Sequence, residues 1–123
     1  MLLKDFYTVE KLENIAPGKY SAFIVLNNKH DVFKGHFPGN PVTPGVCMMQ
    51  IIKELTQDIL GCSLIMTASS NVKFMAIINP DINPNLKLDL EILGDNSSEI
   101  KVKNTTSFND TIALKLSNVY KTV

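Results

Sequence analysis

Residues 33–46 carry the side chains best suited to chemistry, and they read FKGHFPGNPVTPGV. The run holds one histidine, three prolines and three glycines. A neutral histidine can accept a proton near pH 7, because the ordinary pKa of its side chain is about 6.5. The prolines restrict the loop and would help to hold His36 in place. A histidine beside an aromatic ring is more often a packed or surface residue, so the role of His36 depends on the register of its neighbours.

Pro44-Gly45 opens the strongest helix candidate, and Gly61 is a natural stop for it. The backbone N–H of Gly45 would lie at the start of this helix, where the helix dipole favours negative charge. Such a group could bind a developing oxyanion, and glycine would permit close approach of a substrate. The apolar stripe of the helix is wide enough to require burial on most sides. It comprises Val46, Met48, Met49, Ile51, Ile52, Leu55, Ile59 and Leu60.

The rest of the chain predicts the scaffold that positions this loop and helix. Residues 20–26 (YSAFIVL) are rich in aromatic and β-branched residues and predict a strand, preceded by a turn at residues 16–18. Residues 5–12 are expected to form a short helix with Phe6, Val9 and Leu12 on one side. After Gly61 the apolar pattern changes to period two. It predicts strands at 64–67, 71–78, 86–93, 99–107 and 111–119, separated by turns at 69–70, 79–81, 94–96 and 109–110.

The order of these elements favours one architecture. Consecutive strands joined by short turns pair antiparallel. An antiparallel sheet curled around one apolar helix buries every apolar face. A length of 123 residues suits a single domain. We therefore expect an α+β fold in one domain that spans residues 1–123.

Charge and cysteine usage exclude several classes of function. The 12 basic and 12 acidic residues balance without a long basic run, so nucleic acid is not an expected partner. No apolar run approaches the roughly 20 residues of a membrane span, and the N-terminus has charges where a signal peptide needs its apolar core. We expect a cytoplasmic protein. Cys47 and Cys62 have no CxxC partner or nearby histidine, so we expect two reduced structural thiols and no metal site.

Residues 33–46, together with residues 71–75 (NVKFM), resemble the signature of the bacterial 3-hydroxyacyl-[acyl-carrier-protein] dehydratases. The resemblance extends over roughly residues 20–120. It implies a hotdog fold, in which an antiparallel sheet wraps around one long central helix. It also implies a dimer with two active sites at the subunit interface. The acyl substrate would be carried on the phosphopantetheine of an acyl carrier protein, in fatty acid or polyene-type chain synthesis, so no further cofactor is expected.

The implied reaction assigns roles to residues of the motif. Dehydration removes a proton from C2 and expels the hydroxyl from C3, so it needs a base, an acid and a donor to the thioester oxygen. The resemblance implies His36 as the base and the N–H of Gly45 as the donor. We expect Phe37, Pro44 and Val46 to bind the substrate together with Gly45.

The sequence departs from the family at the acid. The family has an acidic residue fourteen positions after the motif histidine, and here that position is Gln50. An amide has no carboxyl proton to give. Glu54 follows one turn later, where many family members have glutamine. Residues four apart share one helix face, so Gln50 and Glu54 are predicted neighbours.

Three interpretations follow from this exchange. The favoured one is dehydration, with Glu54 as the acid, directly or through a water that Gln50 orients. In the second, Gln50 only binds the hydroxyl and dehydration is slow or absent, so the chain is a carrier-bound acyl binder or the silent half of a heterodimer with an active paralogue. In the third, the scaffold hydrolyses acyl thioesters. Glu54 could instead be a solvated carboxylate near Lys53. The motif gives no support for a site role of His30. The helix dipole could lower the pKa of the Cys47 thiol.

Overall fold

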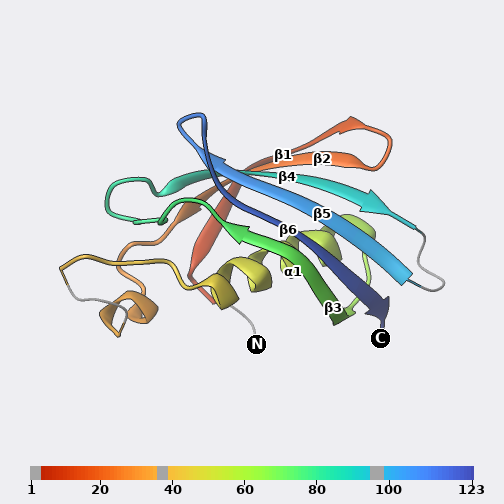
Figure 1. Cartoon of the computed structure of the whole chain (residues 1–123), viewed down its shortest axis with the longest axis horizontal. Coiled ribbons are helices and arrows are strands. Elements are labelled where there is room, and N and C mark those ends of the chain that lie inside the picture. Colours follow the sequence, from red (N-terminus) through yellow and green to blue (C-terminus); the bar gives the residue numbers. More distant parts are fainter. Residues whose placement is uncertain (1–3, 36–38, 95–98) are drawn as a thin grey trace.

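The computed structural model describes residues 4–35, 39–94 and 99–123. In this part of the chain, six antiparallel strands form one sheet in the order β1-β2-β4-β5-β6-β3, and one long helix lies against its inner face (Figure 1). The elements are β1 (Tyr7–Ala16), β2 (Lys19–Leu26), α1 (Gly45–Leu60), β3 (Leu64–Phe74), β4 (Asn85–Leu93), β5 (Glu99–Phe108) and β6 (Thr111–Thr122). The predicted α+β layout, with a curved sheet around one central helix, is confirmed.

The helix begins and ends where the sequence predicts. Pro44 is its N-cap residue, and Gly61 ends it in the left-handed conformation at φ 70°, donating its N–H to the carbonyl oxygen of Gln57 at 2.8 Å. The predicted apolar stripe is wrong at Val46, which is 68% exposed. Thr56 is buried instead, because its hydroxyl donates to the carbonyl oxygen of Ile52 at 2.7 Å and so needs no water.

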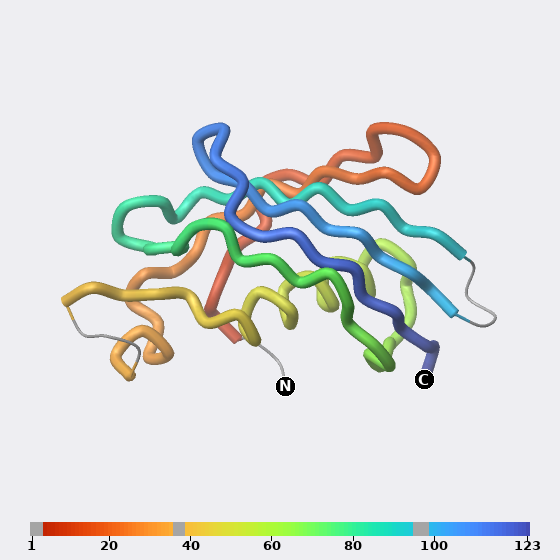
Figure 2. The backbone as a smooth tube through the Cα atoms, in the orientation of Figure 1, coloured from red at the N-terminus to blue at the C-terminus, as the bar shows by residue number. Residues whose placement is uncertain are grey.

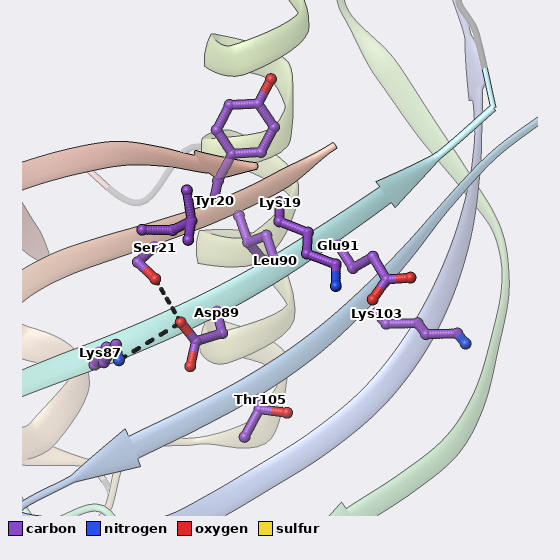
Figure 3. A pocket seen from close by; sticks show the side chains of 10 residues that line it. Lys19, Tyr20, Ser21, Lys87, Asp89, Leu90, Glu91, Lys103 and Thr105 are labelled. Atoms are coloured by element: carbon purple, nitrogen blue, oxygen red, sulfur yellow. Dashed lines mark hydrogen bonds and ion pairs between the residues drawn. The ribbon is translucent and has the colours of Figure 1, made fainter. Parts of the chain in front are cut away.

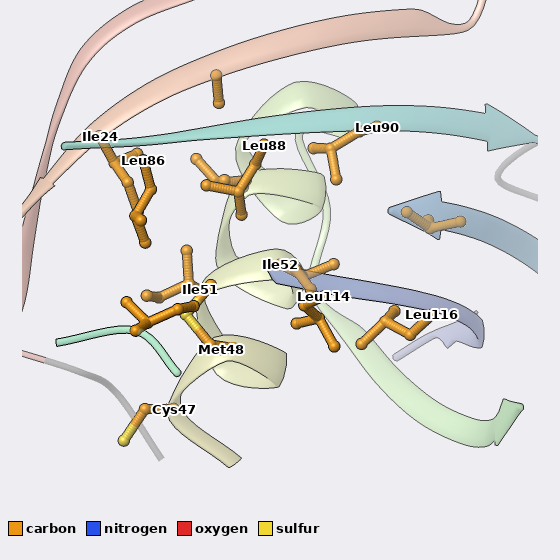
Figure 4. Packing of buried hydrophobic residues seen from close by; sticks show 14 of the residues in the cluster. Ile24, Cys47, Met48, Ile51, Ile52, Leu86, Leu88, Leu90, Leu114 and Leu116 are labelled. Carbon is orange, nitrogen blue, oxygen red and sulfur yellow. The ribbon is translucent and has the colours of Figure 1, made fainter. Parts of the chain in front are cut away.

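The core fills the space between α1 and the concave face of the sheet. Alternate residues of β4 point inward, so Leu86, Leu88 and Leu90 meet the buried face of the helix (Figure 4). Ile51 and Ile52 of α1 have no exposed surface. Burial of side chains of this size contributes about 1.5–3 kcal/mol each, which fixes the position of the helix under the sheet.

The predicted short helix at residues 5–12 is wrong, because β1 occupies this segment and pairs with β2 from Tyr7 to Ala16. Asp5 has a positive φ of 59°, which an α-helix does not accommodate. Phe6 is fully buried, whereas Val9 and Leu12 are 40% and 42% exposed, so the three do not share a buried helical face. Backbone pairing at the sheet edge, and not an apolar stripe, determines the structure here.

The predicted division between residues 64–67 and 71–78 is also wrong, because β3 is one strand that ends at Phe74. Ser69 belongs to the strand, and its hydroxyl lies 2.6 Å from Oδ1 of Asn118 on β6. Asn71 has a φ of 53° at a register shift between Ser70 and Lys73, so the chain bulges there without turning. Residues 75–78 leave the strand and return toward the start of α1, where the N–H of Thr43 donates to the carbonyl oxygen of Ile78 at 2.9 Å.

The remaining connections follow the prediction. Turns at residues 16–18 and 109–110 join β1 to β2 and β5 to β6, and the predicted turn at 94–96 extends into residues outside the described part. The loop before α1 contains one 3₁₀ turn, Asp31–Lys34, and is otherwise irregular over its described residues. Figure 2 shows this loop entering α1, with the red N-terminal end of the described chain, including the beginning of β1, descending from the sheet to the level of the helix. No helix in the described ranges is long and apolar enough to cross a membrane.

Candidate active site

The motif loop is described on both sides of its histidine. His36 and Phe37 themselves lie outside the described residues, so their roles stay predictions. Pro44 and Gly45 stand at the start of α1. The hydrogen bonds of the helix begin at Cys47, whose N–H donates to the carbonyl oxygen of Pro44 at 3.0 Å. The N–H of Gly45 precedes this ladder, so the helix leaves it available for a ligand.

An apolar groove of about 450 Å³ opens beside the start of α1. One wall is residues 42–45, and the other is residues 74–78. Pro44 and Gly45 therefore line it as predicted substrate contacts, whereas Val46 is exposed to solvent and is not part of the lining. A Cβ at Gly45 would lie 2.7 Å from Cζ of Phe74, so the aromatic ring packs directly against the glycine backbone. Its lining is mostly apolar, which suits an apolar ligand.

Gln50 and Glu54 are neighbours on α1, as predicted. The side-chain nitrogen of Gln50 donates to Oε2 of Glu54 at 2.9 Å. The hydroxyl of Tyr7 donates to Oε1 of the same carboxylate at 2.8 Å. A carboxylate can only accept, so the nitrogen of Gln50 must face it and the amide oxygen must point elsewhere. Glu54 is thus not merely a solvated carboxylate near Lys53.

No sequence pattern points to Tyr7 as a partner of Glu54. It lies 47 residues from Glu54 and at the start of an exposed edge strand, so neither spacing nor periodicity connects the two. Burial raises the pKa of Tyr7 above that of an ordinary tyrosine, and the hydrogen bond to Glu54 and the charges of Glu54 and Asp58 raise it further. Tyr7 is therefore a protonated donor across the physiological pH range.

Helix geometry separates the possible roles of Gln50 and Glu54. Gln50 lies about 7.5 Å along the axis from Gly45, and Glu54 lies about 13.5 Å along it. Side chains on a helix lean toward its N-terminus, so both side chains reach back toward the start of α1 from their own turns. Of the two residues, Gln50 therefore lies nearer to the start of α1.

The two cysteines are free thiols, as predicted. The proposed lowering of the Cys47 pKa by the helix dipole is wrong, because burial raises the pKa of this thiol. His30 caps the 3₁₀ turn: Nδ1 accepts from the N–H of Val32 at 3.1 Å, and Nε2 lies 3.0 Å from the carbonyl oxygen of Lys4. Both histidine nitrogens are thus engaged in holding the loop. Within the described ranges, no group of His, Cys, Asp and Glu residues could hold a metal ion.

A second depression of about 490 Å³ lies on the outer face of the sheet (Figure 3). Ser21 donates to Asp89 at 2.6 Å, and the ammonium of Lys87 lies 3.9 Å from the same carboxylate. These polar groups satisfy one another on a solvated surface. The depression lacks the apolar walls of the groove beside Gly45, and we do not assign chemistry to it.

The chain matches the ApeI-like family, described as ApeI dehydratase, over residues 13–113. The chain belongs to the ApeI-like dehydratase family. The match includes the motif loop, the whole of α1 and the strands β2, β3, β4 and β5.

Two curated relatives extend the comparison. The 3-hydroxyacyl-[acyl-carrier-protein] dehydratase FabZ of Caulobacter vibrioides is 31% identical over 119 residues, which cover 88% of this chain and 73% of that protein. The enzyme of the same name from Clostridium acetobutylicum is 32% identical over 94 residues, covering 69% of this chain and 64% of that protein. This member of the ApeI-like family thus spans slightly less than two thirds of the clostridial relative.

Solved structures confirm the hotdog fold. The dehydratase heterocomplex ApeI:P from Xenorhabdus doucetiae superposes with a TM-score of 0.72 at 20% identity, covering 91% of this chain and 96% of that chain. A hypothetical thioesterase protein with coenzyme A from Streptococcus pneumoniae superposes with a TM-score of 0.70 at 11% identity, covering 99% and 91%. At these identities the two structures establish the architecture and not the reaction.

Proposed function

We propose that this ApeI-like protein is a hydro-lyase that dehydrates 3-hydroxyacyl thioesters on acyl carrier protein to trans-2-enoyl thioesters. One observation carries the proposal: in a member of a dehydratase family, an apolar groove opens beside the start of α1 with Gly45 in its lining, and Gln50 follows on the same helix. The groove would take the acyl chain. Gly45 and Gln50 would bind the two polar groups of the substrate, the thioester oxygen and the C3 hydroxyl.

The proposed reaction needs one proton carrier. Neutral His36 takes the proton from C2, and the electron pair forms the C2=C3 double bond as the C3–O bond breaks. Negative charge that develops on the thioester oxygen is stabilised by the N–H of Gly45 and the dipole of α1. The histidinium returns its proton to the departing hydroxyl, which leaves as water. Protons therefore balance without a carboxylic acid at position 50.

Gln50 binds the hydroxyl in this proposal. Its nitrogen is committed to Glu54, so its oxygen can accept a hydrogen bond from the C3 hydroxyl. That bond strengthens as the hydroxyl gains a proton and becomes water-like, which favours the transition state over the bound substrate. Glu54 lies one turn further along α1, and in this proposal it acts through Gln50. If Glu54 were itself the acid, Glu54→Gln would lose far more activity than this proposal expects.

The proposed partners are an acyl carrier protein, whose phosphopantetheine would carry the substrate, and a second copy of the chain. The sheet edge at β3 supports the second copy, because large apolar side chains on it and just after it are exposed. They include Ile65 at 55%, Phe74 at 57% and Ile77 at 69%. We propose the cytoplasm as the compartment, which two free thiols support.

A second candidate function is a non-catalytic subunit. Gln50 favours a non-catalytic role, because an amide has no carboxyl proton to give. The structure of similar fold from Xenorhabdus doucetiae is a dehydratase heterocomplex. As a non-catalytic subunit, the chain would be inactive alone and would co-purify with a paralogue that keeps the acidic residue. Thioester hydrolysis has less support, since the hypothetical thioesterase from Streptococcus pneumoniae shares only the fold with this chain.

Hydration of a trans-2-enoyl thioester, the reverse reaction, tests the proposal. We expect the purified protein to hydrate carrier-linked substrates and His36→Ala to lose this activity. Loss of the enoyl absorbance would be followed on both carrier and CoA thioesters of several chain lengths. No turnover by the wild type on any of them would remove the enzyme proposal and favour the subunit.

A further inference from the structure

Tyr7 reaches α1 from a rigid segment. The carbonyl oxygen of Phe6 accepts from the N–H of Asn27 at 2.8 Å, and the carbonyl oxygen of Asp5 accepts from the side chain of Asn27 at 2.9 Å. Phe6 is fully buried and stacks on Phe33 at 5.3 Å between ring centroids. The residues before Tyr7 are therefore fixed to the loop that leads into the motif, and the phenol is held at a defined place over the helix.

The hydrogen bonds of Glu54 couple Tyr7 to Gln50. Tyr7 donates to one carboxylate oxygen at 2.8 Å, and Gln50 donates to the other at 2.9 Å. The first bond sets the rotation of the carboxylate, and the carboxylate in turn sets which end of the Gln50 amide faces it. An amide can otherwise turn over with little change in shape, since its oxygen and nitrogen ends are nearly the same size.

We infer that Tyr7 is a positioning residue, which acts through Glu54 to keep the oxygen of the Gln50 amide directed at the substrate hydroxyl. The inference rests on the proposed function, because it deepens the role given to Gln50. Without the phenol, the carboxylate would lose one of its restraints. Gln50 would then present its nitrogen to the substrate for part of the time, and that nitrogen cannot accept the hydrogen of the hydroxyl.

A positioning role predicts a specific kinetic change. The groove that holds the acyl chain is lined by residues 42–45 and 74–78, and Tyr7 is not among them. Removal of its hydroxyl should therefore leave KM within about twofold and lower kcat about tenfold, as expected when a substrate-binding group is misoriented. A purely structural role would instead lower the melting temperature and leave the kcat of the folded fraction unchanged.

The test compares Tyr7→Phe with Tyr20→Phe, a control at another half-buried tyrosine that packs against the core. Gln50 and Gln57 are the two glutamines of the chain, so selective ¹⁵N labelling gives two side-chain amide signals. Gln57 is an internal reference, because its oxygen accepts from the N–H of Leu64 at 2.8 Å in another part of the helix. The Gln50 signals should move and broaden in Tyr7→Phe, while those of Gln57 stay in place.

Two readouts decide the inference. Movement of the Gln50 signals together with a tenfold loss of kcat supports it, provided that Tyr20→Phe changes neither. Unmoved Gln50 signals, or moved signals with an unchanged kcat, would overturn it. A wild type without hydration activity would remove the proposed function itself, and the amide signals would still decide whether Tyr7 fixes the orientation of Gln50.

Discussion

Gln50 donates a hydrogen bond to Glu54 at 2.9 Å, one turn further along α1. The contact joins the residue at the position of the family's acid to the carboxylate nearest to it. Gln50 lies about 7.5 Å along the axis from Gly45 and Glu54 about 13.5 Å, so Gln50 is the nearer of the two to the start of α1. In the proposed function the pair divides two tasks, since the amide binds the hydroxyl and the carboxylate orients the amide.

Glu54→Gln should lower kcat about tenfold, because an amide has one oxygen and can no longer accept from Tyr7 and Gln50 on two separate oxygens. A general acid would show a larger loss, about 10²- to 10⁴-fold. Steady-state hydration of a carrier-linked enoyl thioester measures the difference. Glu99→Gln, the same change at an exposed position on the sheet, is the control. A loss of a thousandfold or more would assign the acid to Glu54 and contradict the division of tasks.

Gly45→Ala should narrow the groove with little effect on stability. The new Cβ would lie 2.7 Å from Cζ of Phe74, but that ring is 57% exposed and can move aside. Alanine also favours the helix by about 1 kcal/mol, which offsets part of the strain. We expect the melting temperature to stay within a few degrees and KM to rise severalfold.

Gly61→Ala is the matched control for this experiment. Gly61 ends the same helix at φ 70° with no atom near its missing side chain. Alanine there should cost about 1 kcal/mol of stability through the left-handed backbone and leave KM unchanged. A Gly45→Ala protein with the KM of the wild type would show that the groove does not hold the substrate.

Thr43→Val should stabilise the protein. The hydroxyl of Thr43 is buried and, among the described residues, has no hydrogen-bond partner. Valine has the same shape without the unsatisfied group, so the free energy of unfolding should rise by about 1 kcal/mol. Urea denaturation measures the change. Thr56→Val is the comparison, because Thr56 is bonded to Ile52 and should gain nothing. Equal effects in the two variants would argue against an unsatisfied hydroxyl at Thr43.

The sequence predicted the helix and its flanking loop well, because local chemistry determines them. Pro44, Gly45 and Gly61 fix the two ends of α1, and spacing alone places Gln50 beside Glu54. The β1 strand was mistaken for a helix, because an edge strand exposes most of its side chains and shows no alternation. The contact from Tyr7 joins elements remote in sequence and depends on how β1 approaches α1. No local pattern carries that information.

Alkaline pH should reveal the buried phenol of Tyr7. Its pKa is raised in the folded state, chiefly by burial and then by Glu54, so the folded protein holds this proton more tightly than the unfolded chain. The stability from Tyr7 is therefore complete below the ordinary tyrosine pKa of about 10 and is lost as pH rises above it. Tyr120, whose pKa burial also raises, contributes in the same direction.

Denaturation of the wild type and Tyr7→Phe between about pH 8 and 12 isolates the Tyr7 contribution. The variant retains Tyr120, so its stability should still fall above about pH 10, but less steeply than that of the wild type. Parallel curves would contradict the burial of a protonated phenol against Glu54.

The most direct measurement is elimination of water from a 3-hydroxyacyl chain on acyl carrier protein by the wild type beside the exchanged variant Gln50→Glu/Glu54→Gln. This variant places a carboxyl group at the position within reach of the hydroxyl and an amide one turn later. We predict turnover by both proteins, with a rate about tenfold or more higher in the variant, because a positioned acid adds to the contribution of His36. A silent wild type beside an active variant would contradict the central claim and show that the natural chain has lost the reaction.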